Sequence, residues 1–342
     1  MKVWFPLIRV GSGSDVYTER LARALERYGI TAEVDRFDSW YELSPWLLRY
    51  RRPPQHTCLI HANSWNGFAF KRDDVPLVVT VHHSSHDPEF HRYKSILQRM
   101  YHATFVKSFE CASLSRAAAV VAVSHYAARS IQDAVGIAAT DVIHNWIDTE
   151  LYKPLADFQG DGEGRKRTFT ILYVGNLRRA KGVDLLPRIM AALGQKFQLR
   201  YTRGMRKGDI VHRTANMIPL DGLAGESLIK EYQSCDALLF PSRSEGFGLV
   251  ALEAMACGKP VIASRASALT EVVADGETGI LCPLDDVDAF ASACRRLAAD
   301  PQLCSVMGAN ARRRAVDYFS EERIIPQYAA LYERLVAKSN RK

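Results

Sequence analysis

The chain has 342 residues, of which 47% are hydrophobic, and its formal net charge is +7. This length exceeds roughly 250 to 300 residues, at which a single hydrophobic core stops growing, so two domains are expected. The composition excludes a disordered chain, and no run approaches the ~18 consecutive apolar residues that span a membrane. The apolar run at residues 1–8 is too short for a signal peptide, so we expect a cytoplasmic protein.

Cysteine and charge usage bear on the compartment and on the ligand. The seven cysteines include no Cys-x-x-Cys pair, which favours reduced thiols over disulfides or a metal site. The whole excess of Lys and Arg over Asp and Glu lies after residue 165. Such a local positive field favours a phosphorylated ligand or an anionic surface, although a solvated face explains most of these residues individually.

The chain begins with a predicted strand, a glycine turn and a helix. Residues 2–9 are rich in apolar side chains, residues 10–15 have the sequence Val-Gly-Ser-Gly-Ser-Asp, and a pattern with helical spacing follows. This order suits a loop that faces a phosphate. Val16 stands where a dinucleotide-binding fingerprint has its third glycine, so a tight turn without a ligand explains Gly11 and Gly13 nearly as well.

A histidine-rich segment follows the strand predicted over residues 77–81. Parallel sheets usually place their chemistry at this end of a strand. A zinc site is one interpretation, but the spacing fits no helix-borne ligand pair and Pro88 interrupts the segment. We favour one strand-end histidine that points into a cleft, with a hydrogen-bonded structural histidine as the alternative, and we expect no metal. The five zinc-ligand candidates are His82, His83, His86, Asp87 and His91.

Two segments combine large apolar side chains with basic residues. The first spans residues 40–52 and contains Trp40, Trp46 and three arginines, and the second is a long helix predicted over residues 93–114. Core packing is the default explanation for the apolar face of that helix. Segments that lie on membrane surfaces have the same mixture, so contact with an anionic membrane, on its inner face, is the alternative for both segments.

A polar, glycine-rich segment over residues 151–167 separates two α/β halves. We place the first domain at residues 1–160 and the second at 161–320, with a C-terminal helix over about 321–342 that packs back on the first. Two successive α/β halves predict a cleft enzyme whose ligand touches both. The further strands predicted from apolar runs are 57–61, 118–124, 170–174, 199–202 and 217–220.

Residues 236–264 are the most informative stretch of the chain. A short apolar strand at 237–240 is followed by a turn-rich segment and by a strong helix-forming segment at 249–257, which Gly258 closes. Ligands of open parallel sheets bind beyond the carboxyl ends of the strands, where helix N-termini offer free N–H groups and a partial positive charge. The segment from Glu245 to Gly248 is expected at that edge.

The same stretch contains a specific motif. Its sequence is Pro241-Ser-x-x-Glu245-Gly-Phe-Gly-Leu-x-x-Leu-Glu253-Ala-Met-Ala-x-Gly258. This motif resembles the E-x7-E motif of family 4 glycosyltransferases, and the resemblance covers nearly the whole chain. It implies the α/β GT-B fold, with two Rossmann-like domains facing across a cleft. The supporting matches are Val174-Gly-Asn-Leu-x-x-x-Lys181-Gly182, Asn145 with Asp148, Thr80-Val-His82, and Glu271-Val-Val-x-Asp275-Gly276.

The resemblance implies a role for each matching residue. Glu245 corresponds to the carboxylate that meets the donor sugar, Glu253 to the one that binds the nucleotide ribose, and Lys181 to the lysine of the diphosphate. His82 corresponds to a histidine near the transferred sugar, and Gly13 belongs to a loop under the phosphates. His82, Glu245 and Lys181 are the implied catalytic residues. The other implied donor-binding residues are Asn176, Arg178, Gly246, Phe247, Gly248 and Leu249.

These roles imply retaining transfer of a hexosyl group from a nucleotide-diphosphate sugar to a glycan, glycolipid or lipid-linked acceptor, as in cell-surface polysaccharide or lipopolysaccharide synthesis. Negative charge develops on the leaving diphosphate, where a lysine and a helix N-terminus stabilise it without a metal or another cofactor. The alternatives are a sugar-nucleotide epimerase or hydrolase, and a protein that only binds a nucleotide sugar or dinucleotide. Nucleic acid is not an expected partner, and the donor and acceptor stay open.

Three positions depart from the family's pattern. Asn176 stands where many relatives have an arginine beside the diphosphate, so another arginine is expected to supply that charge. Asn63 replaces the second histidine of a His-x-His that begins at His61, which weakens a role for that loop. Trp146 follows Asn145 where a glycine is usual, which implies a stiffer hinge or a more aromatic acceptor cleft. The candidates for the missing charge are Arg178, Arg179 and Arg203.

Overall fold

A computed structural model describes residues 1–83, 96–155, 168–203 and 213–341. The chain forms two compact units, one of Met1–Asn145 with Glu321–Lys342 and one of Trp146–Ser320. The division thus lies upstream of the boundary at residue 160 that the glycine-rich segment suggested. The reason is a backbone contact, because the N–H of Ile147 donates to the carbonyl oxygen of Phe319 at 2.9 Å and joins this segment to the second unit.

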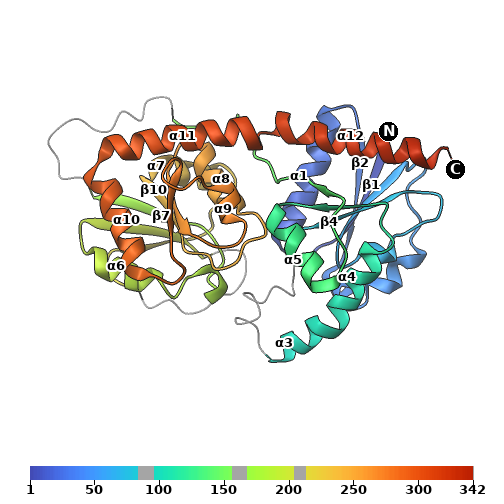
Figure 1. Ribbon diagram of the computed structural model, residues 1–342, viewed down its shortest axis with the longest axis horizontal. Coiled ribbons are helices and arrows are strands. Elements are labelled where there is room, and N and C mark those ends of the chain that lie inside the picture. The colour runs from blue at the N-terminus through green and yellow to red at the C-terminus, as the bar shows by residue number, and fades with distance from the viewer. Residues whose placement is uncertain (84–95, 156–167, 204–212, 342) are drawn as a thin grey trace. The chain divides into compact units, whose positions relative to one another are not determined.

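The first unit contains one sheet of six parallel strands in the order β2-β1-β3-β4-β5-β6 (Figure 1). The strands are β1 (Lys2–Ile8), β2 (Thr31–Phe37), β3 (Leu59–Asn63), β4 (Leu77–Val81), β5 (Ala119–Ala122) and β6 (Asp141–Val142). The helices and short turns are α1 (Gly13–Arg27), η1 (Ser39–Glu42), η2 (Pro45–Tyr50), η3 (Gly67–Ala69), α3 (Ile96–Tyr101), η4 (His102–Val106), α4 (Lys107–Leu114), α5 (His125–Val135) and α12 (Glu321–Ser339).

Polar contacts join helix α12 to the first sheet. His61 of β3 is buried, with Nδ1 2.5 Å from the hydroxyl oxygen of Tyr332 and Nε2 2.6 Å from that of Thr80. Tyr17 of α1 donates its hydroxyl proton to the hydroxyl oxygen of Tyr328 at 2.5 Å. Because buried polar groups are costly without partners, these bonds specify how α12 packs on the unit.

The helix predicted over residues 93–114 is buried only towards its end. Its first three residues lie outside the described parts of the chain, and α3, the π-helical turn η4 and α4 follow. Leu114 is buried, but Ile96, Met100 and Phe105 are 68%, 63% and 54% exposed. The expectation of core packing is wrong for these three residues, because α3 extends away from the sheet and α4 is the part that packs against η3 and α5 (Figure 1).

The second unit repeats the plan with a sheet in the order β12-β11-β10-β7-β8-β9, again parallel. The strands are β7 (Phe169–Tyr173), β8 (Phe197–Thr202), β9 (Met217–Leu220), β10 (Ala237–Phe240), β11 (Val261–Ser264) and β12 (Gly279–Cys282). The helices are η5 (Arg179–Lys181), α6 (Leu186–Leu193), α7 (Glu226–Ser234), α8 (Leu249–Ala256), α9 (Leu269–Val272), α10 (Val287–Ala299) and α11 (Pro301–Phe319).

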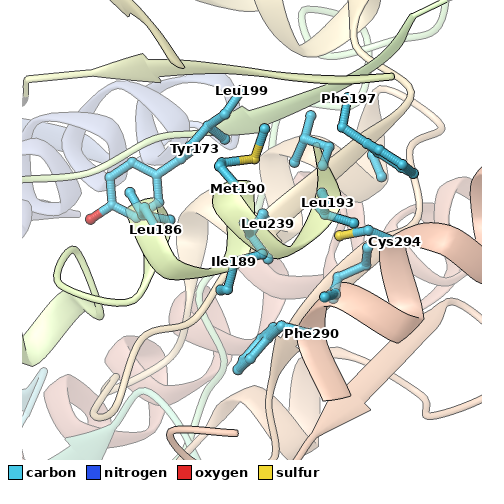
Figure 2. Close-up of a cluster of buried hydrophobic side chains, with 14 of the residues drawn as sticks. Tyr173, Leu186, Ile189, Met190, Leu193, Phe197, Leu199, Leu239, Phe290 and Cys294 are labelled. Carbon is cyan, nitrogen blue, oxygen red and sulfur yellow. The ribbon is translucent and has the colours of Figure 1, made fainter. Parts of the chain in front are cut away.

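Figure 2 shows the hydrophobic core on one face of the second sheet. Ala237 and Leu239 of β10 lie in this cluster with side chains of β7, β8, α6 and α10. Successive side chains of a strand point to opposite faces, so Leu238 and Phe240 face the side of the sheet that α8 covers. Strands β7 and β10 pair directly, and each leads into a loop that carries predicted site residues.

The predicted α/β class with two Rossmann-like sheets is confirmed. Strands β2 and β12 were not predicted, and in β2 charged residues interrupt the apolar ones. All seven cysteines are free thiols. In residues 1–83, 96–155, 168–203 and 213–341, no helix combines the length and apolar character needed to cross a bilayer.

The burial of His61 predicts a pH-dependent stability. Burial lowers the pKa of His61 from 6.5 to about 3, so below pH 6.5 the unfolded chain binds a proton that the folded chain does not. Stability therefore falls as the pH drops from 6.5 towards 3, by up to about 1.4 kcal/mol per pH unit from this group. We expect His61→Gln to be less stable than the wild type at pH 7 and the gap to narrow at pH 5. Urea unfolding midpoints measure this, and an unchanged gap would contradict it.

Candidate functional site

Two loops of the second unit bring Lys181 and Glu245 together. One loop follows β7 and contains η5, and the other follows β10 and leads into α8. Because β7 and β10 are adjacent parallel strands, both loops leave the same edge of the sheet. The Nζ atom of Lys181 lies 2.7 Å from Oε1 of Glu245 and 3.4 Å from the carbonyl oxygen of Ser244. The side chains are 30% and 13% exposed, so this ion pair remains accessible to a ligand.

Glycines allow these loops to approach so closely. Gly182 has a φ of +70°, and a Cβ atom on it would lie 2.1 Å from the carbonyl oxygen of Pro241. Gly248 precedes α8 with a φ of +106°, and a Cβ atom there would lie 2.8 Å from the side chain of Leu269. Both positions combine a backbone conformation that favours glycine with a neighbour that excludes a side chain. These two glycines are therefore requirements of the site's geometry.

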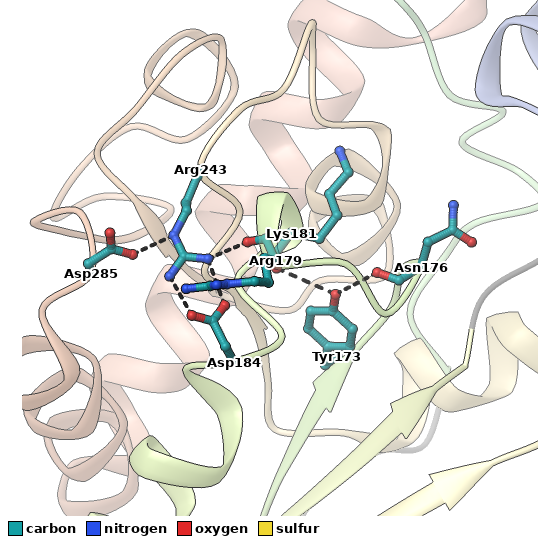
Figure 3. A network of polar contacts seen from close by, with 7 residues as sticks. All are labelled: Tyr173, Asn176, Arg179, Lys181, Asp184, Arg243 and Asp285. Carbon is teal, nitrogen blue, oxygen red and sulfur yellow. Dashed lines mark hydrogen bonds and ion pairs between the residues drawn. The ribbon is translucent and has the colours of Figure 1, made fainter. Parts of the chain in front are cut away.

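A buried tyrosine of β7 forms hydrogen bonds with the backbone of the loop that follows this strand. The hydroxyl oxygen of Tyr173 lies 3.3 Å from the carbonyl oxygen of Asn176 and 3.4 Å from that of Lys181, and the two carbonyls share its one proton (Figure 3). These bonds tie both ends of the loop to one side chain of the core. Asn176, predicted beside the diphosphate, thus lies on the same loop as Lys181, with its carbonyl oxygen bound to Tyr173.

The second glutamate of the motif is buried more deeply than the first. Glu253 of α8 is 7% exposed, and its carboxylate accepts hydrogen bonds from the hydroxyls of Tyr232, at 2.8 Å, and Tyr152, at 3.3 Å. Burial, with the nearby Glu253 charge, raises the pKa of Tyr232 well above its ordinary value, so that hydroxyl stays a donor. The second glutamate of the motif is thus held in place by two tyrosine hydroxyls.

The segment between Glu245 and α8 presents backbone rather than side chains. Phe247 is 3% exposed, and its ring packs against that of Phe319 with centroids 5.6 Å apart. The N–H of Glu245 donates to the hydroxyl oxygen of Ser267 at 2.9 Å and fixes the start of the segment. Because the Phe247 side chain is buried, any contact of Phe247 with a donor would come from its main-chain groups.

The three arginines proposed for the missing charge differ in their surroundings. Arg203 already faces the carboxylate of Asp221, with Nε 3.1 Å from Oδ1. Arg178 and Arg179 are both exposed and lie on the loop that carries Lys181. Arg178 and Arg179 thus share a loop with Lys181, whereas Arg203 is already paired with a carboxylate.

In the first unit, His82 follows β4 and is half-buried. Its Nε2 lies 3.1 Å from Oδ1 of Asn63, and the ring of Tyr17 meets the imidazole edge-on with centroids 4.4 Å apart. Burial lowers the pKa of His82 to about 4, so the ring is neutral at pH 7. With Nε2–H donating to Asn63, Nδ1 is left as an acceptor. Asn63 thus orients His82, which the comparison with the family pattern did not predict.

The five zinc-ligand candidates lie only partly in the described residues. His82 and His83 lie in the described part of the chain, whereas His86, Asp87 and His91 lie outside it. Within the described ranges, no three His, Cys, Asp or Glu side chains gather as a metal site requires. Nothing in these residues adds to the sequence-based interpretation of this segment.

The glycine loop after β1 already binds a carboxylate of the chain itself. Oδ2 of Asp15 accepts the N–H of Val10 at 2.9 Å and that of Gly11 at 2.7 Å, and Ser12 caps α1, which begins at Gly13. Two donors of the loop proposed to lie under the phosphates thus have an internal anionic partner. Ser12 followed three residues later by Asp15 is the spacing of a capping box, so the longer bond from the N–H of Ser12 to Oδ2 of Asp15, at 3.4 Å, was predictable.

Two protein-family models match the chain. One, described as Glycosyltransferase Family 4, matches residues 37–151, and the other, described as Glycosyl transferases group 1, matches residues 168–300. Each match is to a glycosyltransferase model, and neither match alone covers half of the chain. Together the two models cover most of both units, including the loops of Lys181, Glu245 and His82.

Curated relatives are about a third identical to this chain over the part that matches. An MMP alpha-(1->4)-mannosyltransferase of Mycolicibacterium hassiacum is 34% identical over 208 residues, which are 56% of this chain and 47% of the relative. A D-inositol 3-phosphate glycosyltransferase of Kribbella flavida is 34% identical over 202 residues, covering 50% of this chain and 45% of the relative. The chain spans about half the length of the curated relatives it matches.

Solved structures show the same fold. Sucrose-phosphate synthase of Thermosynechococcus elongatus superposes with a TM-score of 0.82 at 24% identity, over 99% of this chain and 100% of that one. Anabaena Alr3699/HepE in complex with UDP-glucose has a TM-score of 0.75 at 20% identity, over 98% and 100% of the two chains. The two Rossmann-like units are those of the GT-B fold, as the sequence resemblance implied.

The hydrogen bonds of Tyr232 and Tyr152 to Glu253 predict that removal of each hydroxyl lowers the stability by a different amount. Removing a hydroxyl that donates to a buried carboxylate costs about 1.5–3 kcal/mol. We expect Tyr232→Phe to lower the free energy of unfolding within that range and Tyr152→Phe to lower it less, because its bond is longer. Urea unfolding measures both, with Tyr318→Phe on the exposed face of α11 as the control. Equal losses in all three variants would show that Glu253 gains nothing from the pair.

Proposed function

We propose that the chain is a retaining glycosyltransferase that moves a hexosyl group from a nucleotide-diphosphate sugar to a glycan, glycolipid or lipid-linked acceptor. The observation that carries this proposal is the Lys181–Glu245 ion pair at the carboxyl edge of the second sheet. Curated relatives bear the names of sugar transferases, and one structural neighbour was solved with UDP-glucose. Neither matched family model is that of an epimerase or a hydrolase.

The ion pair suggests how a donor would be bound. In the absence of donor, Lys181 and Glu245 neutralise each other across 2.7 Å. A diphosphate would compete for the ammonium group, and Glu245 would then be free to accept hydroxyl groups of the sugar. The exchange replaces one anionic partner of Lys181 by another, and the sugar hydroxyls would replace the ammonium group as hydrogen-bond donors to the Glu245 carboxylate.

The transfer itself needs stabilisation of the leaving group. The bond from the anomeric carbon to the phosphate oxygen breaks, a bond to the acceptor oxygen forms on the same face, and the acceptor proton passes to the leaving phosphate. Lys181 and the N-terminus of α8 would stabilise the developing negative charge, with Arg178 as the second cation, so no metal is required. His82, neutral at pH 7, would bind a sugar hydroxyl.

Substitution of the ion pair tests this function. We expect Lys181→Ala and Glu245→Ala each to lower kcat/KM by about 100-fold or more, as loss of a charge-stabilising group does. Both side chains are partly exposed, so the fold should persist. Turnover is measured with UDP-, GDP-, ADP- and dTDP-sugars, after a thermal-shift screen in which a ligand at 100 times its Kd stabilises by about 2.7 kcal/mol.

Lys196→Ala, which removes an exposed lysine before β8, is the matched control and should retain activity. Near-normal turnover in either Lys181→Ala or Glu245→Ala would refute the proposal. Release of free sugar from the donor at the same rate with and without acceptor would instead indicate a hydrolase.

We also propose that the acceptor is reached at an anionic membrane surface. In η1 and η2, Trp40, Trp46 and Tyr50 are 52%, 43% and 74% exposed. Ring contacts join this segment to α4, since Trp46 and Phe109 have centroids 5.9 Å apart. The arginines Arg49, Arg51 and Arg52 lie in the same segment and are exposed. Aromatic side chains with adjacent arginines are suited to insert among headgroups and to attract anionic lipids.

Vesicle binding tests the membrane proposal. We expect co-sedimentation with vesicles of phosphatidylglycerol and phosphatidylcholine at low salt, and weaker binding at high salt, because salt screens the arginines. A variant with Trp40, Trp46 and Tyr50 all replaced by serine should lose most of this binding. The control is Tyr318→Ser, an exposed aromatic on α11 of the second unit. Equal binding of the triple variant and the control, or no binding of the wild type, would refute the proposal.

A further inference from the structure

Arg243 is a charged residue of the motif that lies in the interior, behind the ion pair. It occupies one of the two variable positions between Ser242 and Glu245, and it is 5% exposed. Its guanidinium forms a two-pronged pair with Asp184, with Nη1–Oδ1 at 2.6 Å and Nη2–Oδ2 at 2.9 Å. Its Nε lies 2.6 Å from Oδ1 of Asp285 (Figure 3). One side chain therefore joins three separate loops.

Two further contacts of Arg243 reach the backbone next to Lys181. The N–H of Arg243 donates to the carbonyl oxygen of Ala180 at 3.0 Å, and Nη1 donates to the carbonyl oxygen of Arg179. Gly182, on the other side of Lys181, lies against the backbone of Pro241. The loop of Lys181 is thus held on both sides of the lysine by the loop that carries Glu245.

Arg243 is not itself available to a diphosphate. A guanidinium has five N–H donors, and contacts with Asp184, Asp285 and Arg179 engage all three of its nitrogens. Burial opposes the charge on Arg243, but its hydrogen bonds to the two carboxylates outweigh burial and raise its pKa. Figure 3 shows the Lys181 side chain extending away from this guanidinium. The two cations therefore serve different purposes.

We propose that Arg243, held by Asp184 and Asp285, is a positioning residue that fixes Lys181 and Glu245 relative to each other before the donor binds. A lysine side chain on an unrestrained loop would lose conformational freedom on binding a diphosphate, and that loss would weaken binding and transfer. A loop fixed in advance avoids this cost. The inference rests on the proposed function, because it assigns Lys181 and Glu245 to the donor.

The geometry demands an arginine at this position. A lysine could keep the charge but not the planar set of donors that spans two carboxylates and a carbonyl oxygen. Arg243→Lys should therefore behave more like Arg243→Gln than like the wild type. A purely electrostatic role would predict the opposite order, with the lysine variant restoring function.

Hydrogen exchange and ligand affinity together test the positioning role. In Arg243→Gln we expect the amides of residues 176–186 and 241–248 to exchange about tenfold faster or more, because local opening becomes easier. We expect the affinity for the tightest binder among UDP, GDP, ADP and dTDP to fall about tenfold or more, and kcat to fall more than KM rises.

The matched control is Arg200→Gln. Arg200 of β8 also forms an ion pair, with Nη2 2.6 Å from Oε1 of Glu231, but it touches neither loop. In this variant we expect the amide hydrogen exchange of residues 176–186 and 241–248, and the nucleotide affinity, to match the wild type. Asp285→Asn provides a milder variant, because it leaves the pair with Asp184 intact, and it keeps the test usable if Arg243→Gln does not fold.

The outcomes separate the two proposals. Wild-type exchange and affinity in Arg243→Gln, or in Asp285→Asn if the first does not fold, would overturn the positioning role. A wild-type protein that binds none of the four nucleotides and transfers no sugar would overturn the proposed function. In that case the exchange of residues 176–186 alone decides whether Arg243 holds the loop, since it needs no ligand.

Discussion

The close approach of two loop backbones at Gly182 and Pro241 is the constraint on which the second unit's site depends. A Cβ atom at Gly182 would lie 2.1 Å from a carbonyl oxygen, so the loops meet only because that position has no side chain. The approach brings Lys181 within 2.7 Å of Glu245. The interior then supplies a second layer of contacts through Tyr173 and Arg243. The positions of Lys181 and Glu245 at the edge of the sheet therefore depend on the buried contacts of Tyr173 and Arg243.

Much of the fold was predictable, because hydrophobic runs of strand length alternate with helical spacing through both units. Residues 237–240 and 249–257 were assigned correctly on this basis, with the helix one residue shorter in the structure. The periodicity of residues 93–114 led to a wrong prediction of core packing for the first part of this helix. Helical spacing indicates which side chains share a face, but not whether another element covers that face. Ile96 and Met100 share a face that nothing in the sequence could show to be exposed.

The site was predictable in part. Contacts between residues close in the sequence could be predicted, and contacts between distant residues could not. Contacts within a motif, such as the capping of α1 by Ser12 and Asp15, follow from spacing alone. Contacts between Asn63 and His82, or between Arg243 and Asp285, join residues 19 and 42 positions apart, and no periodicity relates them. Such partners depend on how strands are ordered in the sheet, which the sequence leaves open.

Helix α12 has a consequence for the synthesis of this protein. The first unit is discontinuous, since its last helix follows the whole of the second unit in the chain. Tyr328 and Tyr332, which contact Tyr17 and His61, leave the ribosome after the whole of the second unit. The second unit is therefore complete while Tyr17 and His61 of the first unit still lack these partners. An arrest of translation before residue 321 would leave one folded unit and one that a chaperone must protect.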